Sequence, residues 1–410
     1  MTSEEINGRR FAFPPDSPEA IDRVSQALLA TSRRARAAAA DRRATRLAVA
    51  SSWTGAAGHA AQHRFSRLAE QALEIGTALD DSVAAVRGYH DQITEARAAI
   101  VEVRARYALV SARIGALSTE RTVSLSEGGA TVGTDAKIRA TALLDEAAAC
   151  EIAYRAVMRR VIAAADHCSQ TLLDRAGAVP EGGVTVARAV DGRTDGREDP
   201  NDRILREYQV TEDPEGLIDW KPSGFNGWIA SWFRDRDETQ LMTEHEGKML
   251  DERSPEDLYM LEKIKKRAEE EASGRFEPSL VGRGNSDHLD AFRHAYWSAE
   301  QTQYLGSKWT EEYTTSHERA VDNEPEREAM DLYNNEVGRR IAAENKFLDE
   351  EDLAQKVEDA IENGEMLVIG PGGRLYWSDE VTQDEAGQLP AHVDPAPGHR
   401  NAPDHHNDSY

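Results

Sequence analysis

The sequence predicts a mainly helical protein: a long antiparallel helical hairpin or three-helix bundle, followed by a compact helical domain with a small C-terminal β-hairpin. Three observations lead to this prediction. Apolar residues recur at steps of three and four through the first 175 residues, which keeps them on one face of an α-helix. Proline stands at the start of several such stretches, where a helix tolerates it best. A short apolar run around Gly370-Pro-Gly-Gly373 is typical of two strands joined by a tight turn.

Three long helices are predicted in the N-terminal part. The first begins at Pro18, with Ser17 as its N-cap, and ends near residue 53. The second covers about 57–116 and the third about 135–175. Only a serine interrupts the apolar face of the second helix, which is formed by Phe65, Leu68, Ala72, Ile75, Leu79, Ser82, Val86, Tyr89, Ile93, Ala96, Ile100, Val103, Tyr107, Val110 and Ile114. We expect such faces to pack against one another in an elongated bundle.

Charge divides the chain into two modules. The whole protein has a formal net charge of −25, but residues 1–177 hold 21 acidic and 23 basic side chains, against 53 and 26 in the remainder. We therefore expect a helical bundle over 1–177 and a compact domain over 224–377. Residues 178–223 contain many Gly and Asp-Pro turn signals, which predicts a flexible linker. Residues 378–410 are polar and lack periodicity, which predicts a disordered tail.

The same composition limits the choice of partner and compartment. An acidic C-terminal part repels nucleic-acid phosphates, so stable nucleic-acid binding is not expected. No run of eighteen apolar residues occurs, so no transmembrane segment is expected. Residues 1–15 lack the apolar core of a cleaved signal peptide. The expectation is either secretion by a route that needs no such peptide or a cytoplasmic location.

Trp53-Thr54-Gly55 stands at the turn between the first two predicted helices. This placement resembles the WXG-type helical proteins exported by ESX (type VII) secretion systems. The resemblance covers about the first 115 residues, and it implies that Trp53 and Gly55 form a secretion motif. It also implies export by the ESX machinery together with a small WXG-type helical partner. The alternative is a coiled-coil spacer in which Trp53 merely plugs the turn.

One feature of that family is missing. A Tyr-x-x-x-Asp/Glu export signal usually follows the second helix, whereas Tyr107 is followed four residues later by Ser111. The partner protein is therefore expected to supply the signal.

Candidate site residues lie in three polar segments of the C-terminal domain. In the first, Ser286 or Asp287 caps a helix on which Asp290, His294 and Trp297 share one face. A carboxylate one turn before an imidazole fixes the tautomer of the ring and raises its basicity, which suits a general base or a metal ligand. The alternatives are an ordinary surface pair and a histidine satisfied in the core.

The second and third segments add acids and amides. His317 and Glu318 are adjacent, so on a helix they point about 100° apart and serve one site only at a helix edge or end. Asp331 and Asn335 lie one turn apart on a further helix, with Asn334 beside them. Buried amides next to an acid all need hydrogen-bond partners, which favours a site over simple packing.

These segments also carry a resemblance. The runs Asp290-Ala-Phe-Arg-His-Ala-Tyr-Trp-Ser-Ala299, His317-Glu318 and Met330-Asp-Leu-Tyr-Asn-Asn-Glu-Val-Gly-Arg339 are similar to an uncharacterised bacterial domain family. That family often stands at the C-terminus of secreted, polymorphic-toxin-like proteins. The resemblance implies a site and a toxin-like architecture, with an immunity protein as a further partner, but it names no substrate.

The sequence thus predicts an ESX-exported effector with a hydrolytic C-terminal domain of unknown substrate. The expected catalytic residues are His294, Asp290, His317, Glu318 and Asp331. The expected substrate-binding residues are Arg293, Asn334, Asn335, Arg339 and Trp297. Two histidines with carboxylates would suit Zn²⁺, or Mn²⁺ with more oxygen ligands.

Two other hypotheses stay open. One is a non-enzymatic effector that binds an envelope or partner surface, with the same side chains in a buried polar network. The other is a cytoplasmic coiled-coil scaffold. Convergence of the three segments on one open pocket would favour catalysis, and mutual satisfaction of buried side chains would favour a structural role.

Overall fold

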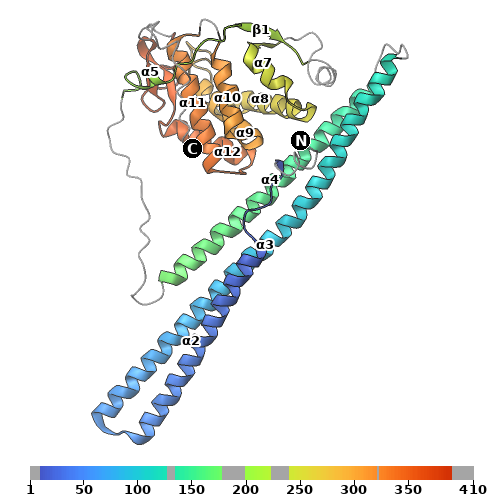
Figure 1. Ribbon diagram of the computed structural model, residues 1–410. Coiled ribbons are helices and arrows are strands. Elements are labelled where there is room, and N and C mark those ends of the chain that lie inside the picture. Colours follow the sequence, from blue (N-terminus) through green and yellow to red (C-terminus); the bar gives the residue numbers. More distant parts are fainter. Residues whose placement is uncertain (1–9, 127–133, 178–198, 223–239, 321–322, 390–410) are drawn as a thin grey trace. The chain divides into compact units, whose positions relative to one another are not determined.

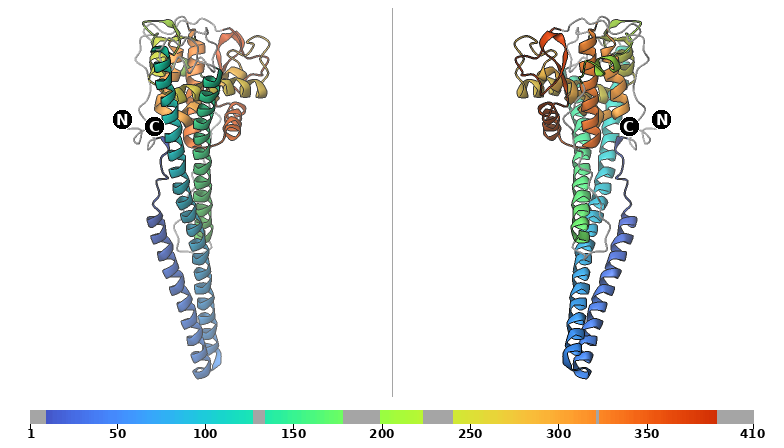
Figure 2. Two further views of the ribbon diagram at one scale, coloured as in Figure 1. Left: turned by 90° about the vertical axis from the view of Figure 1, so that its right-hand side faces the viewer. Right: turned by 90° about the vertical axis from the view of Figure 1, so that its left-hand side faces the viewer.

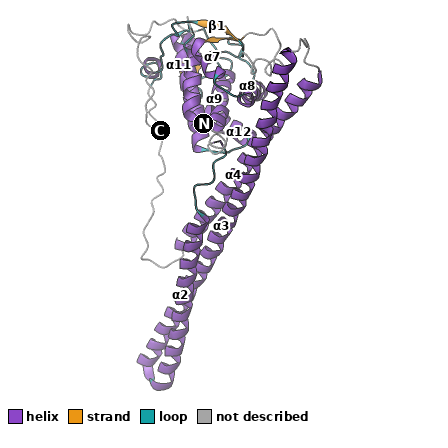
Figure 3. Ribbon diagram, turned by 45° about the vertical axis from the view of Figure 1, so that its right-hand side comes forward, coloured by secondary structure: helices purple, strands orange, loops and turns teal. Residues whose placement is uncertain are grey.

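The computed structural model describes residues 10–126, 134–177, 199–222, 240–320 and 323–389. Helices make up nearly all of the regular structure of these residues, as predicted (Figure 3). The chain divides into two compact units, one of Met1–Arg106 with Ala153–Gly192 and the other of Tyr107–Ile152 with Arg193–Tyr410. Each unit is described by itself below.

The three long helices form where the sequence predicts them. Helix α2 covers Pro18–Ser52, α3 covers Gly55–Ser126 and α4 covers Thr134–Gly177. Ser17 caps α2, and its hydroxyl accepts a hydrogen bond from the Ala20 N–H. Helix α3 continues ten residues beyond its predicted end near residue 116. Residues 127–133 lie outside the described part.

The turn between α2 and α3 is built around Trp53 and Gly55. Trp53 is the C-cap of α2, and its N–H donates to the Val49 carbonyl at 2.8 Å. Gly55 begins α3 with a φ of +84°, a conformation that glycine adopts without strain. The Trp53 side chain is 52% exposed, so it does not plug the turn. Figures 1 and 2 show α2 running back along α3 from this turn.

Burial along α3 follows the number of neighbouring helices. Arg175, near the end of α4, forms a 3.1 Å ion pair with Asp81 of α3, so α4 ends level with this point. Beyond it toward the turn, α2 is the one helix of the described residues that runs beside α3, and Leu68 is 37% exposed. From Ser82 onward most of the predicted apolar face is buried. Two helices leave part of an apolar face in contact with water, and a third helix covers it.

Helix α9 is the centre of the second unit. It covers His288–Leu305 and packs against α8 (Pro255–Arg275), α10 (Ser307–Glu318), α11 (Pro325–Glu344) and α12 (Glu350–Glu362) (Figure 1). The core of this unit is formed mainly by small and aromatic residues of α9 with apolar residues of α11, α12 and the following strand. Because α9 is surrounded, most of its side chains are buried, the polar ones included.

Two small antiparallel sheets complete the unit. The predicted hairpin is confirmed: β3 (Leu367–Ile369) pairs with β4 (Leu375–Trp377) across the short 3₁₀ helix Pro371–Gly373. The other sheet was not predicted. Strand β1 (Leu217–Trp220) pairs with β2 (Gln240–Thr243), which leads directly into α7 (Glu244–Asp251). These strands are short and distant in sequence, so no local sequence pattern predicts their pairing.

Parts of the segments expected to be linker and tail are packed into this unit. Ile204 in the short helix α5 (Ile204–Glu207) and Trp220 in β1 are buried, as are Val381 and Ala386 after β4. These segments are polar on average, so composition alone did not predict that single apolar residues within them are part of the core. The remainder of the expected linker and tail, residues 178–198, 223 and 390–410, lies outside the described residues.

Candidate active site

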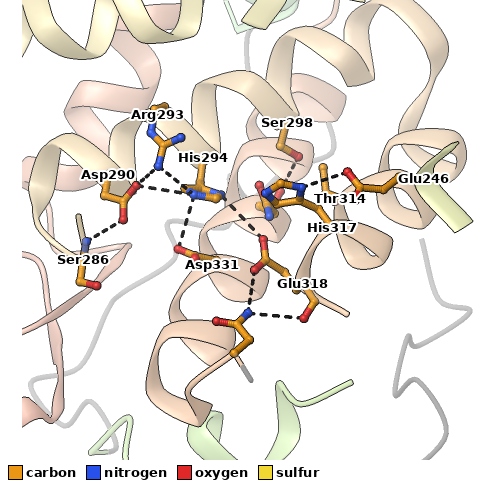
Figure 4. A network of polar contacts seen from close by, with 12 residues as sticks. Glu246, Ser286, Asp290, Arg293, His294, Ser298, Thr314, His317, Glu318 and Asp331 are labelled. Carbon is orange, nitrogen blue, oxygen red and sulfur yellow. Dashed lines mark hydrogen bonds and ion pairs between the residues drawn. The ribbon is translucent and has the colours of Figure 1, made fainter. Parts of the chain in front are cut away.

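Residues from three helices meet around the imidazole of His294 (Figure 4). His294 is on α9. Its Nε2 lies 3.6 Å from Asp290 Oδ1 and 3.8 Å from Asp331 Oδ1, while its Nδ1 lies 4.0 Å from Glu318 Oε1. Asp331 comes from α11 and Glu318 from the last turn of α10. We call these four residues the His294 cluster; all of them are buried.

Asp290 is fixed by the start of α9. The N-cap Asp287 accepts hydrogen bonds from the backbone N–H groups of Ser279, Gly284 and Asp290, which ties the preceding loop to the helix. The Ser286 N–H donates to Asp290 Oδ2 at 2.6 Å. Asp290 Oδ1 is thereby turned toward His294. Of the two caps that the sequence left open, Ser286 and Asp287, the structure has Asp287.

Arg293 supplies the positive charge of the site. Its Nη2 donates to Asp290 Oδ1 and lies 3.4 Å from His294 Nε2. The side chain is 37% exposed, so it reaches the buried cluster from the surface of the unit.

His294 is held in its neutral form. Burial disfavours the charged ring, and the nearby Arg293 guanidinium disfavours it further, which together outweigh the attraction of Asp290 and lower the pKa of His294 to about 3. A neutral imidazole keeps one nitrogen lone pair, with which it can accept a proton from water or bind a metal.

The pKa values of the three acids of the cluster are shifted in different directions. Burial opposes ionisation of Asp290. Three neighbours favour its ionised form: His294 when protonated, the Arg293 guanidinium and the Ser286 N–H. Together they hold the pKa of Asp290 below the usual range. Burial, with the neighbouring Asp331, Glu328 and Glu246 carboxyls, raises the pKa of Glu318 well above 4.5. Burial and Asp290 likewise raise the pKa of Asp331. Two acids of the cluster therefore lack an adequate counter-charge.

Three atoms of the cluster are also buried without a hydrogen bond: His294 Nδ1, Glu318 Oε1 and Asp331 Oδ1. Two of them, His294 Nδ1 and Glu318 Oε1, face each other at 4.0 Å, which is too long for a hydrogen bond. Buried polar atoms are rarely left unpaired, and each exception calls for an explanation such as an ion or a catalytic role. The cluster is thus not a satisfied structural network.

A cavity of about 250 Å³ adjoins the cluster. Arg293, His294 and His317 provide polar groups on its wall, and Trp220, Trp297 and Tyr313 provide aromatic ones. His294 therefore stands between the cavity and the carboxyl groups. This arrangement gives a bound molecule access to the imidazole while the acids stay buried.

His317 belongs to the cavity and not to the cluster. Its Nδ1 is 2.9 Å from Glu246 Oε1, and its ring contacts that of Trp297 at a centroid distance of 5.8 Å. Because it is in the last turn of α10, His317 and its neighbour Glu318 flank His294 from the helix end. A helix end is one of the two placements, with a helix edge, in which adjacent helical residues can serve one site.

Three residues expected to bind substrate lie elsewhere. Asn334 pairs with the backbone of Leu367, donating to its carbonyl and accepting from its N–H, both at 2.9 Å. Arg339 is buried and donates to the Thr314 hydroxyl at 3.2 Å. Asn335 is fully buried, and its amide has no partner among the described residues. None of the three lines the cavity.

Two residues of the site escaped the sequence analysis. Glu246 orients His317 and also forms a capping box with Thr243 at the start of α7. The pattern Thr-x-x-Glu could have indicated that cap, but nothing local indicates a partner 71 residues away. Gln301 is fully buried on the cavity wall, and its amide has no partner among the described residues. It lies two turns after His294 on α9, so extending the helical face would have found it.

We expect Glu318→Gln to stabilise the protein in the absence of divalent metal ions. A glutamine keeps the shape but removes a buried acid that has no counter-charge, which should raise the free energy of unfolding by about 1–2 kcal/mol at pH 7.5. Because the folded-state pKa of Glu318 is raised, its stabilising contribution is present below its usual value of 4.5 and is lost as pH rises. The gain should therefore shrink near pH 4.5.

Urea unfolding at the two pH values measures this effect. The control is Glu312→Gln, on the same helix, because the Glu312 side chain is 54% exposed. The electrostatic account is wrong if Glu318→Gln destabilises the protein at pH 7.5 or if both variants behave alike.

Fold and site together define a class: a mainly helical protein with a long helical hairpin and a compact helical domain that holds a buried histidine–carboxylate cluster beside a cavity. Residues 3–124 match the family model of the WXG100 like domain. Residues 248–365 match the family model of a domain of unknown function, DUF6973. No curated protein and no solved structure matches the chain.

These matches confirm the coarser of the sequence predictions. The N-terminal segment is similar to a WXG-type domain, which fits ESX-type secretion and implies a helical, secretion-associated kind of partner. The second match contains every residue of the His294 cluster and belongs to an uncharacterised domain, as the motifs indicated. In the described part of the chain, no helix has both the length and the apolar character needed to cross a bilayer.

Proposed function

We propose that this protein is an effector exported by a type VII secretion system and that its C-terminal domain is a toxin-like hydrolase centred on His294. The observation that carries the proposal is the buried, neutral imidazole of His294 between a cavity and three carboxyl groups. Perturbed groups of this kind cluster at catalytic sites. The unpaired atoms of the cluster favour this reading over a structural network.

In the proposed reaction, a water molecule at His294 is activated and attacks the substrate. Asp290 holds the Arg293 guanidinium beside Nε2 of the ring. Arg293 also lies at the cavity wall, where it binds a negatively charged group of the substrate or of the transition state. His317, held by Glu246, stands on the same wall as a second proton donor or acceptor. Asn334, Asn335 and Arg339 have no part in this mechanism.

The cavity favours an amphipathic substrate. Its aromatic side chains offer an apolar surface, and its wall also carries titratable groups, His294 among them. A molecule with an apolar portion and a polar, hydrolysable group fits both features. We propose that the substrate is an envelope component of this type, which agrees with delivery to another cell by secretion.

The delivery part of the proposal rests on the N-terminal segment. The exposed Trp53 and the glycine turn at Gly55 stand at the end of the α2–α3 hairpin. They act as the secretion motif, together with a small WXG-type helical partner that supplies the export signal. An immunity protein that protects the producing cell completes the proposed set of partners.

Growth of a heterologous bacterium that expresses the full chain, directed to the cytoplasm or to the periplasm, tests the catalytic part. The full chain is required because Ile204 and Trp220, which precede the matched domain, are core residues. We expect a loss of viability in one compartment, and His294→Ala should reduce it by at least about 100-fold, the usual effect of removing a general acid or base.

The matched control is His245→Ala, because His245 is in the same unit, has a side chain that is 40% exposed and does not line the cavity. Its toxicity should equal that of the unchanged protein at the same abundance. Equal killing by the His294→Ala protein would refute the catalytic role. Absence of any growth defect in both compartments would favour a non-enzymatic effector.

A further inference from the structure

We infer that Asp290, His294 and Asp331 bind one divalent transition-metal ion, Zn²⁺ or Mn²⁺, with Glu318 as the outer partner that orients His294. The inference deepens the proposed function, on which it rests for its consequence, because it names what the same site binds. With the ion bound, His294 serves as a ligand, and the activation of water passes from the imidazole to the ion. Its basis is the geometry, the charge balance and the unpaired atoms of the cluster.

The geometry brings three ligand atoms together. One atom each of Asp290, His294 and Asp331 lies within 4.8 Å of the other two. Ligand atoms about 2.0–2.2 Å from one metal ion are at most about 4.4 Å apart. The side chains therefore need only small rotations to reach a common ion. All three come from helices, α9 and α11, which hold their backbones in place.

The charge balance leaves room for a dication. When ionised, Asp290, Asp331 and Glu318 carry three negative charges, and Arg293 supplies one positive charge. Arg327 also acts on Asp331, and the Glu328 and Glu246 carboxyls act on Glu318. A divalent ion therefore offsets the excess of negative charge in the cluster. Buried charges are tolerated when they are paired or coordinate a metal, so an ion removes the penalty that these acids otherwise impose.

The unpaired atoms match the roles expected of ligands and their supports. Asp331 Oδ1, buried without a hydrogen bond, faces His294 Nε2 at 3.8 Å. On the other side of the ring, His294 Nδ1 faces Glu318 Oε1, and both atoms lack partners. Metal-bound histidines commonly donate their second ring N–H to a carboxylate. A small closure of this 4.0 Å gap produces that arrangement.

Arg293 marks the position of positive charge in the cluster. Its Nη2 contacts both Asp290 Oδ1 and His294 Nε2, two atoms that the metal would bind. Since this side chain is partly exposed at the cavity, it can withdraw when the ion binds. The guanidinium would then lie beside the cavity, available to an anionic group.

The ligand set selects the kind of metal. An imidazole nitrogen suits Zn²⁺ and other transition metals, while carboxylates suit Mn²⁺ and Mg²⁺. One nitrogen with two carboxylates therefore favours Zn²⁺ or Mn²⁺ over Mg²⁺ and Ca²⁺.

Metal binding to the full-length, chelator-treated protein tests the inference. Isothermal titration with Zn²⁺, Mn²⁺ and Mg²⁺ is carried out in a background from which the tail histidines have been removed by substitution with glutamine: His392, His399, His405 and His406. We expect one ion of Zn²⁺ or Mn²⁺ per chain, Mg²⁺ binding more weakly, and a rise in melting temperature on loading.

Asp331→Asn and His294→Gln should each weaken this binding by at least about 10-fold, the smallest loss usual even for outer-shell partners. The matched control is Glu312→Gln, which removes a carboxylate 3.3 Å from an exposed imidazole, that of His245, in the same unit. It should bind as tightly as the unchanged protein. Circular dichroism confirms that each variant is folded.

Absence of a one-to-one complex, or equal affinity in both cluster variants and the control, would overturn the inference. The binding measurement does not depend on toxicity. If no metal binds while His294→Ala still abolishes killing, the metal site is wrong and the catalytic role stands. If metal binds through Asp331 but the protein is not toxic, the metal site is correct and the toxin-like role is wrong.

Discussion

Replacement of Gly338 by alanine is expected to destabilise the C-terminal unit by at least about 3 kcal/mol, the upper part of the range for overpacked sites. A Cβ atom at Gly338 would lie 2.0 Å from the Ala295 carbonyl oxygen and within 3 Å of two further backbone atoms of Ala295. Both residues are in the middle of helices, α11 and α9, so neither backbone can shift alone. The helices would have to separate, and this would part Asp331 from His294.

Gly274 provides the matched control. It is in helix α8, where an added Cβ would meet no atom within 4 Å. Gly274→Ala should therefore stabilise the protein by up to about 1 kcal/mol, because alanine is the better helix former. Thermal and urea unfolding of the two variants measure the contrast. Similar stabilities for both proteins would show that the α9–α11 contact tolerates a methyl group and that close packing does not position the cluster.

The sequence predicted those features whose causes are local. Ser17 before Pro18 and Asp287 before α9 are caps that a few neighbouring residues determine. The same holds for the Gly-Pro-Gly-Gly turn between β3 and β4. Within the site, Asp290 and His294 lie one helical turn apart, so their proximity was predictable as well.

The rest of the site depends on tertiary contacts that leave no local pattern. Asp331 reaches His294 because α11 crosses α9 closely at Gly338, and a glycine in a helix does not reveal which backbone it approaches. Glu246 reaches His317 from α7, a short helix that directly follows a strand of the unpredicted sheet. The sequence therefore indicated which polar residues are candidates for a site but could not show which of them converge.

Two adjacent asparagines show this limit most clearly. Asn334 and Asn335 were both expected to bind substrate, yet successive helical residues point about 100° apart and meet different neighbours. Asn334 satisfies both backbone groups of Leu367, where β3 begins. Asn335 has no partner for its amide among the described residues, although its backbone carbonyl accepts from the Ser298 hydroxyl at 2.8 Å.

We therefore expect opposite sensitivities at the two positions. Asn334→Ala would leave the buried N–H and C=O of Leu367 unpaired, at a cost of about 1–3 kcal/mol each, so the loss of unfolding free energy should be roughly 2–5 kcal/mol. Asn335→Ala removes an amide that is buried without hydrogen bonds, so the cost of the lost contacts is offset and the change should stay within about 1 kcal/mol. Urea unfolding of both variants gives the comparison directly.

The result would also decide whether each buried amide has a structural role or takes part in the reaction. If Asn334→Ala is the more damaging change and Asn335→Ala retains both stability and toxicity, Asn334 is a structural clamp on β3 and neither residue binds substrate. If Asn335→Ala instead lowers toxicity at full stability, its unpaired amide serves the reaction, and the site extends along α11 beyond the His294 cluster. Equal losses of stability at both positions would contradict the hydrogen-bond account, because only one of the two side chains holds a strand.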